Sequence, residues 1–475
     1  MLKAIKLYKI PIIFALLSVV FYFNFAYNLH RSDFLKLTTL YTALFFFTYL
    51  LIEKNKLNFW FLASLGIVFR LLFICAIPNL SQDFYRFLWD GRLVAQGMSP
   101  YILTPEMYFQ NLELGFKISG AQKLIEGMGT LSAGHFSNYP PVNQLFFAIA
   151  AFLGGKSLLA SVVILRAIII FADFGILYFG KKILEKLNLF PNRIFWYFLN
   201  PFIIIELTGN LHFEGVMLFF FTVSIYFLFK DKWIWAAIFM GISISVKLIP
   251  LLFLPLFLKF LSNKDATTKN SFSGIESFNL MAILKVYCTV GFTVMLTFLP
   301  FFSSEFIRNF TSTIALWFQN FEFNASIYYL IRWIGFQIVG WNIIEIVGKI
   351  LPVIVFLFVL GLSVFRKNRE PKQLLTAMLF VISFYFLFST TVHPWYLATP
   401  LLLSVFTKYK FPIVWSFAVV FSYSAYGENG FQENLWFVAM EYCMVIGFAI
   451  WENFLKGRIN LENFSKKFNF ISGKE

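Results

Sequence analysis

The chain has 475 residues, of which 59% are hydrophobic and only 13% are charged, and its mean hydropathy is +0.74. This composition excludes a water-soluble globular protein, because no soluble core of this size can hide so much apolar surface. The formal net charge of +15 is compatible with nucleic acid as a partner, but the basic residues lie in short loops between apolar runs. That placement follows the positive-inside rule of membrane proteins and argues against nucleic acid.

Apolar runs that can cross a bilayer recur along the whole chain, which predicts an all-α polytopic transmembrane bundle with about 12 to 14 spans. Residues 142–154 are apolar as well, but a crossing there would move the next lysine cluster to the other side. We therefore expect this segment to be half-buried or re-entrant. The expected spans are 10–27, 34–52, 59–77, 157–180, 194–207, 214–230, 233–246, 248–261, 281–302, 341–365, 373–389, 396–408, 411–425 and 434–453.

An N-terminus on the cytoplasmic side of a plasma (inner) membrane places the lysine-rich turns and the C-terminus on that side as well. The two longest connections, 78–141 and 303–340, then lie on the non-cytoplasmic side, and the first is expected to be helical. The chain is thus predicted to form one transmembrane domain, 1–455, followed by a basic cytoplasmic tail, 456–475. Long outer loops are where we expect chemistry.

The first outer loop opens with an unusually polar and aromatic string, residues 81–92. On a helix, Asp83, Arg86 and Asp90 share one face. An aspartate at a helix start is often only a cap, so Asp83 taken alone has a structural explanation, but the charges around it favour a site. Tyr85, Trp89 and Arg92 of the same string, and Tyr139 where the chain returns to the membrane, complete the candidates from this loop.

The outer ends of later spans are also unusually polar. Trp and Tyr there usually form an interfacial belt, whereas a histidine beside them in a short outer turn is less expected. The four histidines are far apart and no ligand spacing is present, so the sequence predicts no metal site. The candidates for substrate binding at these ends are His212, Glu214, Asn324, Arg332, His393, Trp395 and Tyr396.

Charged residues also lie inside or beside apolar spans, where contact with lipid would be costly. We expect Arg70, Arg166, Asp173 and Lys247 to turn inward to polar partners or water. For Arg166 and Asp173 a structural contact explains the residue at least as well as a function does. Lys247 differs, because the topology places it in an outer turn where its cation can meet a lipid phosphate.

Taken in order, four segments resemble the GT-C superfamily of glycosyltransferases that use polyprenyl-phosphate sugars. The pattern is similar to bacterial mannosyltransferases of glycosyltransferase family eighty-seven and, more distantly, to the first mannosyltransferase of GPI-anchor assembly. The likeness covers about residues 60–400 and would make the transmembrane domain the catalytic one. Its segments are 83–101, Tyr139-Pro140-Pro141, Val246-Lys247-Leu248-Ile249-Pro250 and His393-Pro394-Trp395-Tyr396.

The resemblance implies transfer of a hexose, with mannose as the first candidate, from a polyprenyl phosphate to a glycan or lipid-linked acceptor with inversion. It implies an acidic catalytic base in the first outer loop, which carries onto Asp83 with Asp90 in reserve. No cofactor is required by the sequence. A divalent metal stays an open question, because many GT-C enzymes carry two adjacent acids where this chain has Ser81-Gln82 before Asp83.

The chemistry makes the same demands. A sugar hydroxyl is a poor nucleophile, so a carboxylate has to remove its proton, and we expect an aspartate near water to be ionised without a special environment. The leaving phosphate needs cations, and a sugar or isoprenoid needs an apolar wall. The cation candidates are Arg86, Lys247, Arg332 and His393, and those for the wall are Tyr85, Trp89 and Trp395.

Two other classes of function are compatible with the apolar bulk. A transporter or flippase of lipid-linked glycans is the main alternative, although transporters often show paired repeats with interrupted helices and none is visible in this sequence. A membrane assembly factor without catalysis is the third, but it gives no reason for polar clusters at several outer turns.

Overall fold

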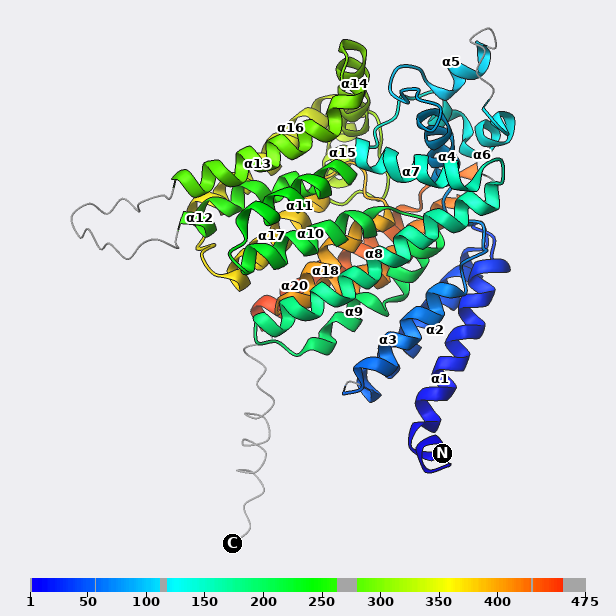
Figure 1. Ribbon diagram of the computed structural model, residues 1–475, viewed down its shortest axis with the longest axis vertical. Helices are drawn as coiled ribbons and strands as arrows, with labels where there is room; N and C mark the ends of the chain where they lie inside the picture. Colours follow the sequence, from blue (N-terminus) through cyan, green and yellow to red (C-terminus); the bar gives the residue numbers. More distant parts are fainter. Residues whose placement is uncertain (1, 56, 112–117, 263–279, 429, 456–475) are drawn as a thin grey trace, which may run out of the picture.

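The computed structural model describes residues 2–55, 57–111, 118–262, 280–428 and 430–455. These residues are helical almost throughout, which confirms the all-α class (Figure 1). Within them one short antiparallel hairpin occurs, formed by β1 (Tyr426–Gly427) and β2 (Gly430–Phe431). The expected basic tail, 456–475, lies outside the described residues.

The N-terminal half consists of three apolar helices, four helices of the first outer loop and a long central helix with its neighbours. Side-chain caps begin several of them, for example Asp33 at α2, Asn58 at α3 and Ser157 at α8, each accepting a backbone N–H. The elements are α1 (Leu2–Tyr27), α2 (Phe34–Lys54), α3 (Phe59–Leu71), α4 (Asp83–Val94), α5 (Pro105–Gln110), α6 (Ala121–Ala133), α7 (Pro141–Gly154), α8 (Leu158–Lys186), η2 (Pro191–Ile194), α9 (Phe195–Phe198), η3 (Ile203–Gly209) and α10 (Glu214–Phe229).

The C-terminal half continues the bundle, and prolines mark many of its helix starts because a proline at the first helical position leaves no unsatisfied N–H. Its elements are α11 (Trp233–Val246), η4 (Ile249–Leu256), α12 (Phe257–Ser262), α13 (Leu280–Phe298), η5 (Leu299–Phe301), α14 (Ser304–Gln319), α15 (Ile327–Val339), α16 (Ile344–Phe365), α17 (Pro371–Leu387), η6 (Pro394–Leu397), α18 (Ala398–Phe406), α19 (Phe411–Ala418), η7 (Val419–Ala425), α20 (Leu435–Ile450) and η8 (Trp451–Leu455).

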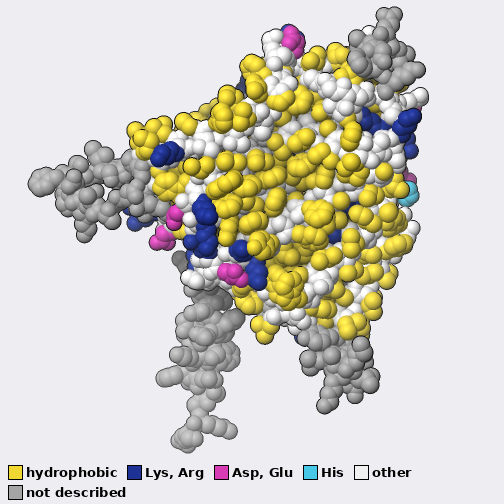
Figure 2. Space-filling model, in the orientation of Figure 1, with side chains coloured by type: hydrophobic (Ala, Val, Ile, Leu, Met, Phe, Trp, Pro, Cys, Tyr) yellow, Lys and Arg dark blue, Asp and Glu magenta, His cyan; other side chains and the backbone are white. Residues whose placement is uncertain are grey.

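Six of the described helices are long and apolar enough to cross a membrane, and η3 with α10, bent by 109°, makes a seventh if the two count as one span. Eight shorter apolar helices of 10–17 residues accompany them. The 12 to 14 crossings expected from the sequence are reached only if most of these shorter helices cross too. Figure 2 shows the broad hydrophobic face that results, with charged side chains toward its edges. The chain is an integral membrane protein.

The charged residues of the spans turn inward, as expected. Arg70 and Asp173 form a completely buried ion pair, with Nε and Oδ2 2.8 Å apart. Arg166 donates to the carbonyls of Thr208 and Gly209, at 2.8 and 3.0 Å. These carbonyls belong to the end of η3, where the helix is broken and would otherwise leave acceptors unsatisfied in an apolar region. These contacts explain Arg70, Arg166 and Asp173 as structural residues.

The basic turns gather at one end of the bundle. Lys182, near the end of α8, and Lys230, directly after α10, both lie over the ring of Tyr226, and Arg193 donates to the carbonyl of Thr407. The helices of the two long outer loops, α4 to α7 and α14 to α15, lie away from this end (Figure 1). The bundle therefore has a basic end and a loop end.

Helix α4 is held close to α7. The rings of Phe87 and Phe147 stack with centroids 4.5 Å apart, and a Cβ at Gly91 would meet the carbonyl oxygen of Phe147 at 2.2 Å. Only glycine permits that approach. With 14 residues, α7 is about 21 Å long, short of the roughly 30 Å of a bilayer core. It buries Asn143 and Gln144 and exposes Phe152, so the segment is half-buried.

Candidate functional site

A cavity of about 1190 Å³ opens at the loop end of the bundle. Its wall is assembled from segments far apart in the sequence, which lie at the outer ends of predicted spans or within the two long outer loops. A site with this composition requires nearly the whole chain to be folded. The lining segments are 30–32, 79–83, 131–132, 135–140, 247–249, 251–252, 313–314, 321–323, 393–396, 426–427 and 430–431, with Arg86, Tyr385, Thr391 and Tyr423.

Asp83 is the first residue of α4 and faces this cavity. Its backbone N–H donates to Ser81 Oγ at 3.3 Å, and the neighbouring Gln82 anchors to the carbonyl of Met128 at 3.0 Å. Throughout the described ranges, no side chain forms a hydrogen bond or ion pair with the Asp83 carboxylate. It is therefore open to a ligand.

The pKa of Asp83 is raised to about 6, chiefly because burial disfavours the charged form. The cation of Lys247 opposes this shift, the carboxylate of Glu214 adds to it, and Arg31 opposes it more weakly. The residue is partly exposed and lines the cavity. The expectation that Asp83 would titrate like an aspartate near water is therefore wrong, although it is still mostly ionised at pH 7.

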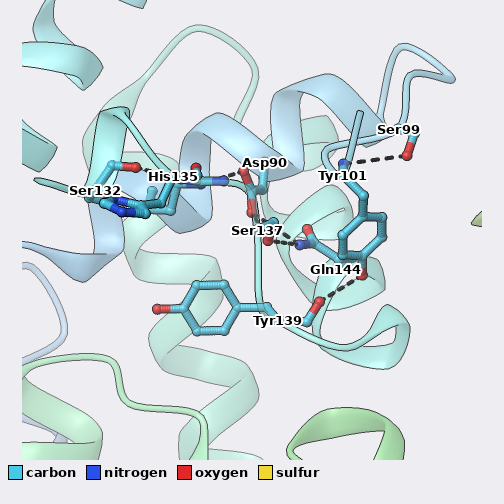
Figure 3. A network of polar contacts seen from close by, with 9 residues as sticks. Asp90, Ser99, Tyr101, Ser132, His135, Ser137, Tyr139 and Gln144 are labelled. Carbon is cyan, nitrogen blue, oxygen red and sulfur yellow. Dashed lines mark hydrogen bonds and ion pairs between the residues drawn. The ribbon is translucent and has the colours of Figure 1, made fainter. Parts of the chain in front are cut away.

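Asp90, two turns further along α4, has a different environment (Figure 3). Its Oδ1 accepts from Arg86 Nε at 2.7 Å, and its Oδ2 accepts from Ser137 Oγ at 2.6 Å and Gln144 Nε2 at 3.0 Å. The side chain is completely buried and does not line the cavity. Both oxygens are already used, so Asp90 holds neighbouring segments together rather than meeting a substrate.

Arg86 links this network to the cavity wall. Its Nη1 donates to the carbonyls of Ser132 and His135, at 2.6 and 2.9 Å, which fixes the segment after α6. The side chain also lines the cavity, and Nη2 has no partner among the described residues. Arg86 is thus a rigidly held cation whose charge is balanced by Asp90.

Lys247 follows the last residue of α11 and extends into the cavity. It forms an ion pair with the fully buried Glu214 at the start of α10, and its Nζ lies 5.9 Å from the centre of the Tyr139 ring. Leu248 and Leu252 continue the wall from this point, and Leu251 beside them is 44% exposed. The cation therefore stands where a polar cavity meets an apolar surface.

Four aromatic rings form a ladder along another wall. Phe323 and His393 have centroids 5.2 Å apart, His393 and Trp395 stack at 4.6 Å, and Trp395 and His212 stack at 3.6 Å. Trp395 stacks on both imidazoles and is only 9% exposed, so little of its ring is open to a sugar. The expectation of an apolar Trp395 face is corrected accordingly.

His393 is also corrected as a cation. Burial, aided by the positive charge of Lys247, lowers its pKa to about 3. The imidazole is neutral at pH 7 and can exchange hydrogen bonds with a ligand, but it cannot balance a phosphate charge.

The structure brings together only part of the predicted set. His212, Glu214 and Asp90 lie behind the cavity wall, in contact with residues that line it. The predicted residues that line the cavity are Asp83, Arg86, Tyr139, Lys247, His393, Trp395 and Tyr396.

The other residues of the string 81–92 point elsewhere. Tyr85 packs over Gly127 of α6, and Trp89 is buried against the ring of Tyr108. Arg92 donates to the carbonyls of Ser119 and Lys156, outside the cavity. Their polarity serves the packing of the first loop, a use that the sequence pattern does not distinguish from ligand binding.

Asn324 lies beside the cavity loop in a left-handed conformation, with φ of +48°. Its N–H donates to Glu433 at 2.6 Å, its side-chain amide donates to Glu441 at 3.3 Å, and its carbonyl accepts from the hydroxyl of Tyr442 at 2.7 Å. The node fastens Phe323 of the wall to α20. Asn324 is thus tied up in the protein, and so is Arg332, which pairs with Glu322 at 2.7 Å.

Sequence reasoning missed Arg31 and Tyr426. The guanidinium carbon of Arg31 lies 4.0 Å from the centre of the Tyr426 ring, and both residues line the cavity. One signal was present, because an arginine in the short outer loop 28–33 runs against the positive-inside rule. Tyr426 carried no signal, since it belongs to a short hairpin that lies hundreds of residues from Arg31 in the sequence.

Fold and site together define a polytopic helical membrane protein with an ionisable acid and several cations around one cavity. A family model described as "Alpha-(1->6)-mannopyranosyltransferase, N-terminal domain" matches residues 36–263. Among the described residues, no group of three His, Cys, Asp or Glu side chains is placed to hold a metal ion.

Two curated relatives extend this comparison. Alpha-(1->6)-mannopyranosyltransferase A of Mycobacterium tuberculosis is 18% identical over 331 residues, which are 69% of this chain and 61% of that protein. GPI mannosyltransferase 1 of Candida albicans is 30% identical over 133 residues, 27% of this chain and 32% of that protein. The chain thus spans less than two thirds of either relative. These matches confirm the resemblance to mannosyltransferases that the motifs predicted.

Proposed function

We propose that the protein is a membrane mannosyltransferase that moves mannose from a polyprenyl phosphate to a hydroxyl of a glycan or lipid-linked acceptor. The observation that carries the proposal is the carboxylate of Asp83, which is unpaired within the described part of the chain. It faces a large cavity with Lys247 nearby. Both residues fall in the region that the mannosyltransferase model matches.

The reaction is a single displacement with Asp83 as general base. The acceptor oxygen bonds to the anomeric carbon as its proton passes to the Asp83 carboxylate, and the carbon–oxygen bond to the phosphate breaks with the electron pair leaving on the lipid phosphate. One displacement inverts the anomeric configuration. A base with a pKa of about 6 suits this step, because it is mostly ionised at neutral pH yet basic enough to take a proton.

The boundary at Lys247 supports a lipid-linked donor. A phosphate held by this cation would place its isoprenoid chain along Leu248 and Leu252, toward the exposed Leu251 and the lipid beyond. The leaving phosphate gains charge as the bond breaks, and Lys247 with Arg86 would stabilise it. The neutral His393 and the hydroxyl of Tyr396 are placed for hydrogen bonds to the sugar.

The placement of charge supports a non-cytoplasmic reaction. The lysine-rich turns lie at the basic end of the bundle, and the positive-inside rule assigns that end to the cytoplasm. Asp83 belongs to the loop end.

The test is transfer by purified protein in vesicles supplied with polyprenyl-phosphate mannose and an alkyl mannoside acceptor. We expect a product heavier by one mannose residue, whose anomeric configuration by NMR is inverted relative to the donor. Polyprenyl-phosphate glucose and polyprenyl-phosphate arabinose, supplied in place of the mannose donor, should give no product. Movement of intact lipid-linked sugar across the vesicle without a new glycosidic bond would overturn the proposal in favour of a transporter.

A further inference from the structure

Contacts to neighbouring residues hold the Arg31 side chain in place in the cavity wall. Its guanidinium lies over the Tyr426 ring at 4.0 Å, and Nη1 donates to the carbonyl of Leu80 at 3.2 Å. The loop that carries it is pinned by Asn79, whose side-chain amide donates to the carbonyls of Phe25 and Leu29 at 2.7 and 3.1 Å. A guanidinium fixed on one face and at one nitrogen presents its remaining N–H groups in a defined direction.

The other cations of this region are balanced by carboxylates. Lys247 pairs with Glu214 and Arg86 with Asp90, and both acids are fully buried. For Arg31, by contrast, no carboxylate of the described chain lies within ion-pair distance. Its charge is therefore available to an anion that enters the cavity.

The wall around Arg31 is polar and roomy, unlike the apolar wall beyond Lys247. His30, Asn79 and Gln82 line it, together with both glycines of the β1–β2 hairpin. A Cβ at Gly427 would meet nothing within 4 Å, so a ligand can approach the backbone there. Arg31 and the hairpin also lie outside residues 36–263, the part matched by the mannosyltransferase model.

We propose that Arg31, held on Tyr426, forms an anion-binding subsite that takes a phosphate or phosphodiester group of a substrate. The nature of the substrate rests on the proposed function, whereas the binding of the anion does not. The phosphate can come from the donor lipid or from an anionic acceptor lipid. The subsite lies at the polar part of the cavity, separate from the boundary at Lys247.

The test compares wild type with Arg31→Gln, using polyprenyl-phosphate mannose and two acceptors. One acceptor is an octyl dimannoside, and the other is the same dimannoside joined to its chain through a glycerophosphate. A lost charge-assisted contact to a phosphate is expected to raise one KM about tenfold. A rise confined to the glycerophosphate acceptor assigns the acceptor as source, and a rise in the donor KM with both acceptors assigns the donor.

Controls separate this role from folding. Arg366→Gln removes an arginine that also lies over an aromatic ring, Phe380, but at the basic end, and should change neither KM. Arg31→Lys keeps the charge and loses the planar fork, so it should recover part of the loss. Gly427→Leu fills the space before the subsite while leaving Arg31 in place, and should raise the same KM. Melting temperatures in detergent verify that each variant is folded.

Binding without transfer makes the two proposals separable. The probes are farnesyl phosphate and the glycerophosphate dimannoside, with farnesol and octyl dimannoside as their uncharged matches. If no sugar is transferred but Arg31→Gln weakens one phosphate probe about tenfold, the subsite stands and the proposed function fails. The subsite is overturned if folded Arg31→Gln keeps both KM values and both affinities within twofold. It is also overturned if Arg31→Gln changes only kcat and its pH profile, equally for both acceptors.

Discussion

Helix α4 carries two aspartates, one in its first turn and one two turns later, and their surroundings are opposite. Asp83 faces the cavity without a partner in the described structure, and its pKa is raised to about 6. Asp90, on the same helix face, is buried and bonded by Arg86, Ser137 and Gln144. A carboxylate that protein groups leave unsatisfied is available for chemistry, whereas one that they satisfy completely holds the fold.

The largest effect on activity is expected from a change of Asp83, the aspartate that faces the cavity. Asp83→Asn removes the base and keeps the shape, so the rate of mannosyl transfer should fall about 10²- to 10⁴-fold in a folded protein. The matched control is Asp231→Asn at the basic end, where the backbone has φ of +61° and asparagine is equally well tolerated. Transfer by Asp83→Asn at the wild-type rate would remove this residue as base.

Asp90→Ala tests the role of the buried aspartate in stabilising the fold. It leaves the charge of Arg86 buried without its partner, which should cost about 3 to 5 kcal/mol of stability, measured by denaturant titration in mixed micelles. Asp83→Asn should be at least as stable as wild type at pH 7. The reason is that a folded pKa above the unfolded value means stability is lost as pH rises from about 4 to 6. Equal stability losses in both variants would contradict the comparison.

The pH dependence of transfer sharpens the role of Asp83. Its carboxylate is protonated below a pKa of about 6, so kcat/KM should fall about tenfold for each further unit and level off above neutrality. The cation of Lys247 opposes the rise in the pKa of Asp83, so Lys247→Met should move the acidic limb of the kcat/KM profile to higher pH. A limb that stays fixed in Lys247→Met would show that another group controls it.

The smallest effect is expected for Arg332→Gln. Its cation is paired with Glu322, and both side chains are about a quarter exposed, so the pair is worth roughly 1 kcal/mol or less. We expect less than about a threefold change in kcat/KM. A loss comparable to that of Lys247→Met would place Arg332 among the groups that meet the phosphate.

The fold was largely predictable from the sequence, because hydropathy patterns and helix-breaking residues are read from short stretches of chain. The described helices follow the expected spans to within a few residues at most ends, and the string that carries Asp83, Arg86 and Asp90 is helical, as considered from its spacing. The third span was wrong at its end, since α3 stops at Leu71 rather than 77 and the chain there turns toward the cavity.

The site was predictable only in part, because long-range contacts decide which polar residue meets a ligand. In the sequence only the family resemblance ranks Asp83 above Asp90. In the structure Ser137 and Gln144, from other segments, satisfy Asp90 and leave Asp83 free of such contacts in the described chain. His212 contacts Trp395, which lies 183 residues further along the sequence, and Arg31 contacts Tyr426 although most of the sequence separates them. Burial sets the pKa of His393, and no local pattern reports burial of that kind.

The node at Asn324 has a consequence for how the protein is made. Phe323 lines the same cavity as Asp83, but the bonds that fasten its loop come from Glu433, Glu441 and Tyr442, more than a hundred residues further along the chain. A growing polypeptide therefore carries Asp83 through the synthesis of hundreds of further residues before the cavity around it is complete. Completion waits for α20 to leave the ribosome and dock.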